Sequence, residues 1–162
     1  MNSPRLVAAK ALVRCEQGGY SQLTIDAALK AAHMTKRDAA LATALFYGAL
    51  ERKNTLDHCM NGYLKKAPDV QVRSVLRIAF YQLLYSKHVA LHAVVNEAVN
   101  SVRALKRSSA AALVNAVLRA FLRDNCKIPD IKGSSEEQLS ISCSCSVDVA
   151  SRFINWMGTD KA

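Results

Sequence analysis

Apolar residues recur at helical spacing in successive segments of the first 125 residues of this 162-residue chain. They stand at positions i, i+3, i+4, i+7 and i+8, which places them on one side of a helix, whereas a half-buried strand would need alternation. Glycine and proline rarely interrupt the pattern, since the whole chain has six glycines and three prolines. The spacing therefore predicts an all-α fold in which amphipathic helices surround one core.

Capping and stop signals divide this region into about seven helices. Ser3 followed by Pro4 is typical of a helix start, and Gly18-Gly19 should end that helix. Thr35, with Asp38 three residues later, is a variant of the capping box and marks another start. The expected helices cover about 4–17, 21–33, 36–50, 56–66, 69–85, 91–106 and 109–122.

Two features indicate where the core lies. Residues 75–84 form the most apolar stretch, so their helix is expected at the centre of the fold. Gly48 stands inside a predicted helix, where glycine costs up to about 1 kcal/mol relative to alanine. We therefore expect a neighbouring helix to approach closely at Gly48.

The helical pattern lapses after residue 125. Turn-forming and charged residues without an apolar repeat predict a linker over 126–145. Ser146 can cap a short helix within 146–162 that ends at Gly158 and carries Phe153 and Trp156 on one side. We expect a helical domain over 3–125, followed by this linker and this short helix.

Positive charge is concentrated in the first part of the chain. Residues 1–125 contain 18 lysines and arginines against 8 acidic residues, whereas residues 126–162 contain 4 against 5. A cationic surface attracts polyanions and speeds their encounter, which suits a nucleic-acid partner.

Several of these cations gather near predicted helix ends, where they could contact phosphates. The ordinary alternative for each single residue is a solvated helix face, so the grouping carries more weight than any one member. The candidate RNA-binding residues are Arg5, Lys10, Arg14, Lys36, Arg37, Arg103, Lys106, Arg107, Arg119 and Arg123.

Catalytic and metal-binding patterns are weak. No nucleophile, base and orienting group can be assembled with any specificity, so no catalytic residue is assigned. His88 and His92 are four residues apart but lack a third ligand, and the spacing of Cys143 and Cys145 does not suit a zinc site. The chain also lacks a secretory signal and an apolar run long enough to span a membrane, so we expect a cytoplasmic protein that binds no membrane.

Three motifs follow one another along the chain, at residues 75–83 (VLRIAFYQL), 92–99 (HAVVNEAV) and 113–119 (LVNAVLR). In this order they resemble the NusB-like family. Gly19-Tyr20-Ser21, Lys36-Arg37-Asp38 and residues 45–50 resemble the version of that fold at the front of bacterial enzymes that make 5-methylcytosine in small-subunit ribosomal RNA. The resemblance covers about residues 5–125, and residues 152–158 resemble the short helical segment leading into the catalytic part of those enzymes.

The resemblance implies a seven-helix bundle in two sub-bundles that holds ribosomal RNA on basic helix ends and positions it for the enzyme. It places S-adenosylmethionine and the catalytic cysteines in a separate domain of the longer protein, so no cofactor is expected in this chain. Cys143 and Cys145 lack the proline that precedes such a cysteine, and they receive no catalytic role.

Two other functions remain open at this point. The first is a free-standing transcription antitermination factor of the same fold, which binds a leader RNA together with a small ribosomal protein. The second is a helical scaffold for another protein, in which the charge serves only solubility. A scaffold would have no salt-sensitive affinity for RNA, which separates it from the first two functions.

Overall fold

The computed structural model describes residues 3–87 and 89–158, and within these ranges the chain has nine α-helices, one short 3-10 helix and no strand. This confirms the predicted all-α fold class. The helices are α1 (Pro4–Glu16), α2 (Ser21–Ala32), α3 (Lys36–Glu51), α4 (Lys53–Asn61), α5 (Val70–Tyr85), α6 (Leu91–Ala104), η1 (Ser108–Ala110), α7 (Ala111–Arg123), α8 (Ser135–Cys143) and α9 (Val147–Met157).

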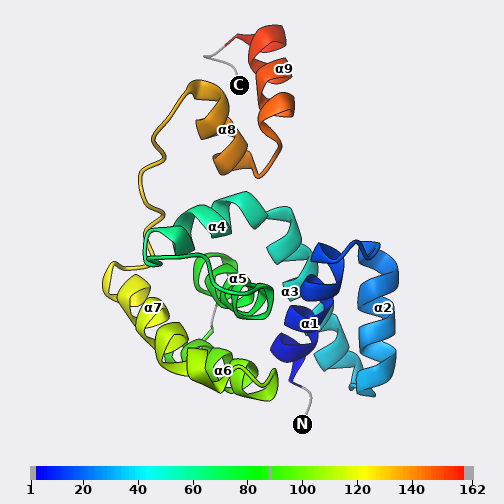
Figure 1. Ribbon diagram of the computed structural model, residues 1–162. Coiled ribbons are helices and arrows are strands. Elements are labelled where there is room, and N and C mark those ends of the chain that lie inside the picture. The colour runs from blue at the N-terminus through cyan, green and yellow to red at the C-terminus, as the bar shows by residue number, and fades with distance from the viewer. Residues whose placement is uncertain (1–2, 88, 159–162) are drawn as a thin grey trace.

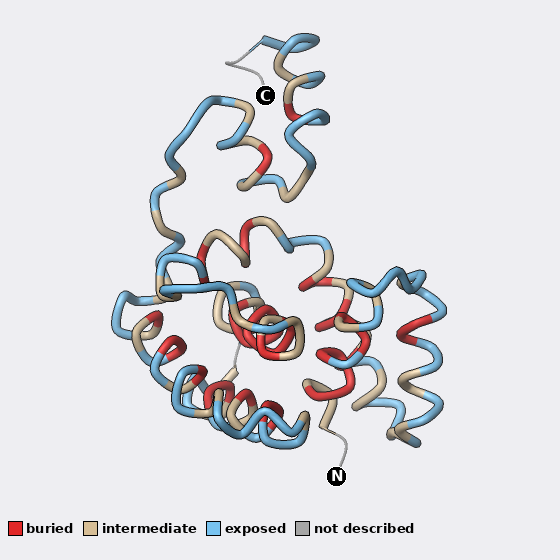
Figure 2. The backbone as a smooth tube through the Cα atoms, in the orientation of Figure 1, coloured by how far each residue is buried: buried red, intermediate tan, exposed pale blue. Residues whose placement is uncertain are grey.

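Helix α5 lies at the centre of the bundle formed by α1–α7 (Figure 1). Helices α1 and α3 pack against one side of α5, with α2 outside them, and α4, α6 and α7 contact its other sides. The inward faces of α1 and α5 are almost wholly buried (Figure 2). Helices α1–α3 on one side of α5, and α4, α6 and α7 on its other sides, share with α5 a continuous apolar core. The repeat of apolar residues predicted such a core.

The helix starts expected at Ser3 and Thr35 are present, whereas α4 starts at Lys53 rather than near residue 56, and α7 starts at Ala111, two residues after the expected start. The Ser3 hydroxyl accepts a hydrogen bond from the backbone N–H of Leu6, which satisfies a free donor in the first turn of α1. Thr35 caps α3 by accepting from the Asp38 N–H at 3.2 Å. The Asp38 carboxylate accepts from the Thr35 hydroxyl at 3.0 Å, whereas a full capping box would have it accept from a backbone N–H.

The expected close approach at Gly48 is confirmed, and the neighbour is Tyr81 of α5. A β-carbon added to Gly48 would overlap the Tyr81 ring at the carbon that bears the hydroxyl. A larger residue at position 48 would therefore require the Tyr81 ring to move.

Four helices end in the same way, with a residue in the left-handed region followed by a reversed hydrogen bond. At the end of α6, Lys106 has φ 58°, and the Arg107 N–H donates to the Val102 carbonyl at 2.8 Å. Gly18, Asn125 and Ser144 occupy the same position after α1, α7 and α8. This is the Schellman motif, which satisfies carbonyls that the helix leaves free. It ends α6 at Ala104, two residues before the predicted end.

Within the predicted linker over 126–145, residues 135–143 form α8, a helix that the sequence pattern did not indicate. A capping box starts this helix: the Ser134 hydroxyl accepts from the Glu137 N–H, and the Glu137 carboxylate accepts from the Ser134 N–H at 2.8 Å. Helix α9 starts at its Ser146 cap and reaches Gly158, and it pairs with α8 as a hairpin. This α8–α9 hairpin packs against α4 through α8 and projects away from the other helices of the bundle (Figure 1).

Candidate nucleic-acid interface

Six of the ten candidate cations lie at three helix ends that the fold brings to one edge of the bundle. Arg5 is in the first turn of α1, Lys36 and Arg37 open α3, and Arg103, Lys106 and Arg107 belong to the end of α6 and the following turn. Figure 1 shows these helix ends along the lower edge of the molecule, and α1 contacts α6. We call these six residues the cationic edge.

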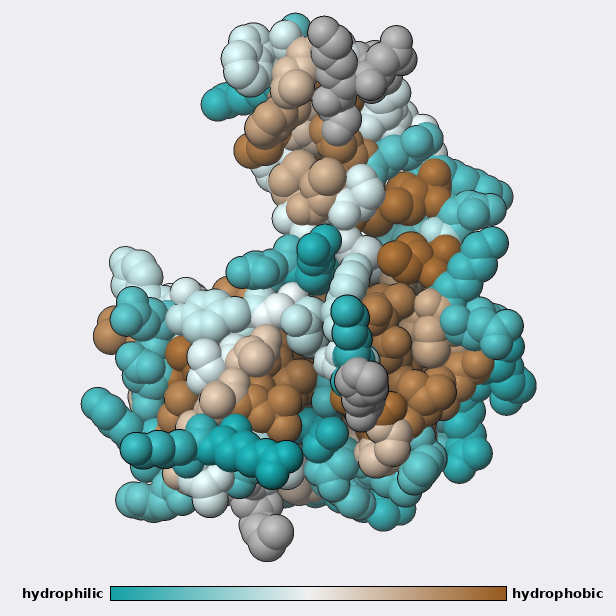
Figure 3. All heavy atoms as spheres, turned by 180° about the vertical axis from the view of Figure 1, so that it is seen from behind, coloured by the Kyte–Doolittle hydropathy of each residue, from teal (hydrophilic) through white to brown (hydrophobic). Residues whose placement is uncertain are grey.

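The side chains of the cationic edge reach solvent, except for Arg5, which is half-buried. Figure 3 shows hydrophilic side chains along most of the lower rim when the molecule is seen from behind. Arg107 pairs with Asp69, the cap of α5, at 3.2 Å, and both side chains are nearly half exposed. An ion pair this exposed contributes little stability, so Arg107 can exchange Asp69 for a phosphate at small cost.

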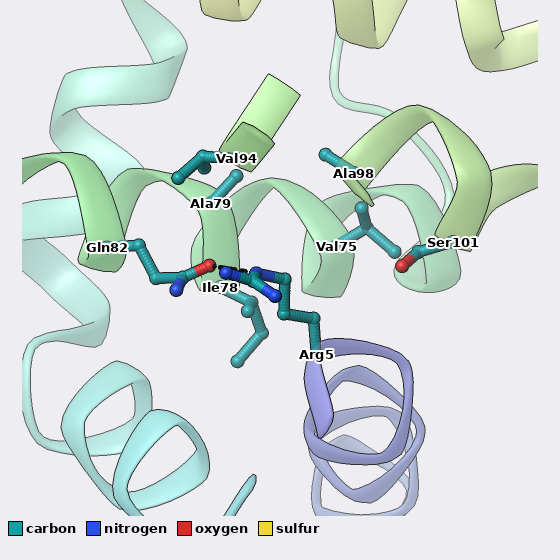
Figure 4. A pocket seen from close by; sticks show the side chains of 8 residues that line it. All are labelled: Arg5, Val75, Ile78, Ala79, Gln82, Val94, Ala98 and Ser101. Carbon is teal, nitrogen blue, oxygen red and sulfur yellow. Dashed lines mark hydrogen bonds between the residues drawn. The ribbon is translucent and has the colours of Figure 1, made fainter. Parts of the chain in front are cut away.

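Arg5 has a second role that its sequence position did not indicate. Its Nε donates to Oε1 of Gln82 at 2.7 Å, and Gln82 is buried on α5. The arginine lies over a small cavity between α1, α5 and α6 that is lined by Val94, Ala98 and Ser101 among others (Figure 4). Arg5 thus links the start of α1 to the core.

An open groove of about 680 Å³ lies next to the cationic edge, between α6 and α7 beside η1. Its polar lining consists of Asn96, Asn100, Arg103, Ser108, Ser109 and Asn115. Asparagine amides and serine hydroxyls both donate and accept hydrogen bonds, so such a lining suits the edges of bases and the ribose hydroxyls of RNA.

Sequence reasoning missed Asn100 and the two serines of this groove as binding residues, although a signal was present. Asn96, Asn100 and Arg103 recur at helical spacing on α6, opposite its buried stripe. Asn115, on the α7 side of the groove, accepts at its Oδ1 from Nε of Arg119 in the same helix at 2.9 Å.

The other four candidate cations lie elsewhere. Lys10 and Arg14 line a separate groove between α1 and α2, with an alanine floor. Arg119 and Arg123 are exposed on α7, and Arg123 is its last residue, about 18 Å along the axis from the first. The structure therefore brings together six of the ten residues and leaves two pairs beside them.

The described residues support neither a cysteine nucleophile at Cys59 nor a metal-ligand cluster among the His, Cys, Asp and Glu side chains. Burial raises the pKa of the Cys59 thiol to about 11, so this cysteine stays protonated near neutral pH. Across 3–87 and 89–158, no three His, Cys, Asp or Glu side chains gather as metal ligands would. His88, half of the histidine pair considered above, lies outside the described residues. None of the described helices combines the length and apolarity needed to cross a membrane.

The family model whose description reads "NusB family" matches residues 2–123, which is the bundle α1–α7. The chain belongs to the NusB family. The expectation drawn from the motifs at 75–83, 92–99 and 113–119 is thereby confirmed.

Curated relatives of this NusB-family chain are ribosomal RNA small subunit methyltransferases B. The chain is 31% identical over 125 residues to the probable enzyme of Bacillus subtilis, covering 75% of this chain and 28% of the relative. It is 37% identical over 121 residues to the enzyme of Thermus thermophilus, covering 72% and 29%. The corresponding enzyme of Pseudomonas putida is 33% identical over 125 residues, covering 75% and 28%. The chain thus spans less than a third of the length of these relatives.

Proposed function

We propose that this chain is the RNA-binding part of a ribosomal RNA cytosine-5 methyltransferase, and that it positions the RNA without contributing a catalytic residue. The observation that carries the proposal is the cationic edge, which joins three helix ends from both sides of the bundle next to a groove lined with amides and hydroxyls. The names of the relatives give the class of RNA, since each acts on small-subunit ribosomal RNA.

Binding through the cationic edge would be driven mainly by phosphate contacts. Each cation that neutralises a phosphate releases condensed counterions, so affinity falls as salt rises, with a logarithmic slope of about −0.7 per contact on single strands. The groove would add hydrogen bonds to bases or riboses, which depend much less on salt.

Replacing Arg103, Lys106 and Arg107 together with alanine tests the proposal. We expect the salt slope for a small-subunit ribosomal RNA fragment to become shallower by about 2, because three phosphate contacts are lost. Fluorescence anisotropy across a range of salt concentrations measures this slope.

Lys65→Ala/Lys66→Ala is the matched control, since these exposed lysines follow α4 and are not on the cationic edge. A triple variant with the wild-type slope refutes the placement of the RNA. RNA binding that requires a ribosomal protein would instead support the antitermination alternative.

The turn at Gly18 and Gly19 does not fit the S-adenosylmethionine that we expect for the full enzyme. Gly18 and Gly19 form a tight turn between α1 and α2, and a β-carbon at Gly19 would lie 2.6 Å from Oγ1 of Thr24. A glycine loop that cradles a nucleotide follows a strand and leaves room for the ligand. We therefore place the S-adenosylmethionine site in the remainder of a longer protein.

The proposed domain organisation follows from the same comparison. Residues 3–125 would form the RNA-binding domain, 126–145 a connection that includes α8, and 146–162 the lead into a catalytic region. The exposed apolar side of α9, with Phe153 and Trp156, would then lie against that region. Translating the DNA downstream of codon 162 tests this: a stop codon contradicts it, and an open frame entering a nucleotide-binding domain supports it.

A further inference from the structure

The α8–α9 hairpin is attached to the bundle through α4. Helix α8 packs against α4 and α9, and the chain enters the hairpin along an extended connection. Seen from behind, the hairpin projects from the bundle with a hollow on one side of the junction (Figure 3). The hairpin itself is mostly exposed, with Ser140 and Ala150 as its buried residues (Figure 2).

Two helix ends cap each other at this junction. The start of α4 has no side-chain cap of its own, and the Thr55 N–H there donates to the hydroxyl of Ser144 at 3.2 Å. In return, the Thr55 hydroxyl donates to the Ile141 carbonyl at 2.6 Å, and Asn54 Nδ2 donates to the Cys145 carbonyl at 2.8 Å. We call this group of hydrogen bonds the clasp.

The clasp gives the Thr55 N–H a partner that α4 itself does not supply, because the first N–H groups of a helix have no partner within it. On the hairpin side it adds a second donor to two carbonyls, since Ile141 also accepts from the Ser144 N–H and Cys145 also accepts from the Ser140 hydroxyl. When the hairpin leaves α4, water can take over these groups. Each bond therefore contributes only a modest factor, roughly 2- to 10-fold, to the equilibrium between attached and detached hairpin. A polar attachment of this kind differs from the apolar packing that holds α1–α7 together.

We propose that the α8–α9 hairpin is an arm that swings away from the bundle as a unit, and that the clasp determines how often the arm is closed. The connection at 124–134 provides the pivot, and His58 contacts it by donating from Nε2 to the Pro129 carbonyl at 3.1 Å. Closing the clasp sets the direction in which the exposed apolar side of α9 faces. This movement of the hairpin does not depend on the proposed RNA binding.

Hydrogen–deuterium exchange of the full chain tests the arm. In the wild type, we expect the amides of α8 to exchange faster than those of α5, because opening the clasp exposes α8 without unfolding the bundle. Asn54→Ala/Thr55→Val should speed exchange in α8 by about tenfold, since several bonds of the clasp are lost. Exchange in α5 should stay unchanged.

Ser144→Ala supplies the same test from the side of the hairpin, so that an effect on α4 alone cannot account for the result. Thr43→Val is the matched control, because the Thr43 hydroxyl donates to the Ala39 carbonyl within its own helix. This control should leave exchange in α8 at the wild-type rate.

Small-angle X-ray scattering separates a swinging arm from a melting one. The clasp variants should show a larger radius of gyration with an unchanged helical circular dichroism signal. Equal exchange of α8 and α5 in the wild type overturns the proposal, as do clasp variants that leave α8 unchanged or speed α5 equally. A loss of helical signal on release also overturns it.

Discussion

Arg77 is a charged residue buried within an apolar helix, where it forms ion pairs with two other helices. It stands within the most apolar stretch of the chain, and its side chain is only 2% exposed. Its Nε and Nη2 donate to the two carboxylate oxygens of Asp57 at 2.7 and 2.8 Å, and its Nη1 donates to Glu16 at 2.6 Å. One guanidinium therefore joins α1, α4 and α5 by hydrogen bonds matched to its planar geometry.

Removing this guanidinium should strongly destabilise the bundle. In Arg77→Ala, Asp57 loses its ion-pair partner and Glu16 keeps only Lys53, and the cost of breaking a buried ion pair is about 3–5 kcal/mol. The Asp57 and Glu16 side chains are 28% and 19% exposed, so water can partly compensate and the lower end of that range applies. Urea denaturation should show the loss, and a change below about 1 kcal/mol would contradict the structural role of the pair.

Glu16 makes the stability of the bundle depend on pH. Burial alone would raise the pKa of Glu16, but hydrogen bonds from Lys53 and Arg77 outweigh burial and leave the pKa below its ordinary value of 4.5. A carboxylate with a lowered pKa stabilises the folded state above the ordinary value, and this stability is lost as the pH falls through the folded-state pKa.

Denaturation at pH 7 and near pH 3 should therefore show a smaller loss of stability in Glu16→Gln than in the wild type, because the variant has no proton to gain at this position. Asp130→Asn, a change of an exposed acidic residue in the connection, provides the control. An equal loss in Glu16→Gln and wild type would assign the acid sensitivity to other groups.

The sequence predicted the positions of helix starts more accurately than those of helix ends. Ser3, Thr35 and Ser146 act as caps at the predicted positions, because a cap depends on a hydroxyl and the next three residues. Helix ends at Lys106 and Ser144 carry no glycine, so the left-handed residue that stops the helix had no local signal. Helix α8 was missed because its capping box at Ser134 is not followed by an apolar repeat.

Lys106→Gly should stabilise the chain by about 1 kcal/mol, because glycine adopts the left-handed conformation at the end of α6 without the cost that a side chain adds. The same change removes a cation of the cationic edge, so the salt slope of RNA binding should become shallower by about 0.7. Thermal unfolding and binding measurements together test both effects.

Asn125→Gly is the comparison for this change, since Asn125 ends α7 in the same conformation but asparagine tolerates it better. Its gain in stability should be smaller, and its RNA affinity should match the wild type. A Lys106→Gly protein that is less stable than the wild type would show that the lysine side chain makes a contact that offsets the backbone cost.

At the scale of the whole molecule, the cationic edge depends on how α1, α3 and α6 are placed. Lys36 and Arg37 are far in sequence from Arg103, yet Figure 1 shows the start of α3 and the end of α6 on the same lower edge. We therefore expect a single RNA segment to contact both the cations at the start of α3 and those at the end of α6.

Lys36→Ala/Arg37→Ala should make the salt slope shallower by about 1.4, and its effect should add to that of the triple change at Arg103, Lys106 and Arg107. Additivity is expected because the two groups contact different phosphates of the same strand. Anisotropy titrations of the combined variant test this, and a double variant with the wild-type slope would restrict the interface to the end of α6.

The sequence by itself determined the helical class, most of the helix starts, the residues of the core and the family. Each of these depends on residues within a few turns of one another, or on motifs that keep their order along the chain. Tertiary structure alone decided the partners of Arg77, the clasp at Asn54 and Thr55, and the grouping of six cations along one edge. The hydrogen bonds among these features join residues 20 to 91 positions apart, and helical periodicity says which side of a helix faces inward but not which neighbour it meets.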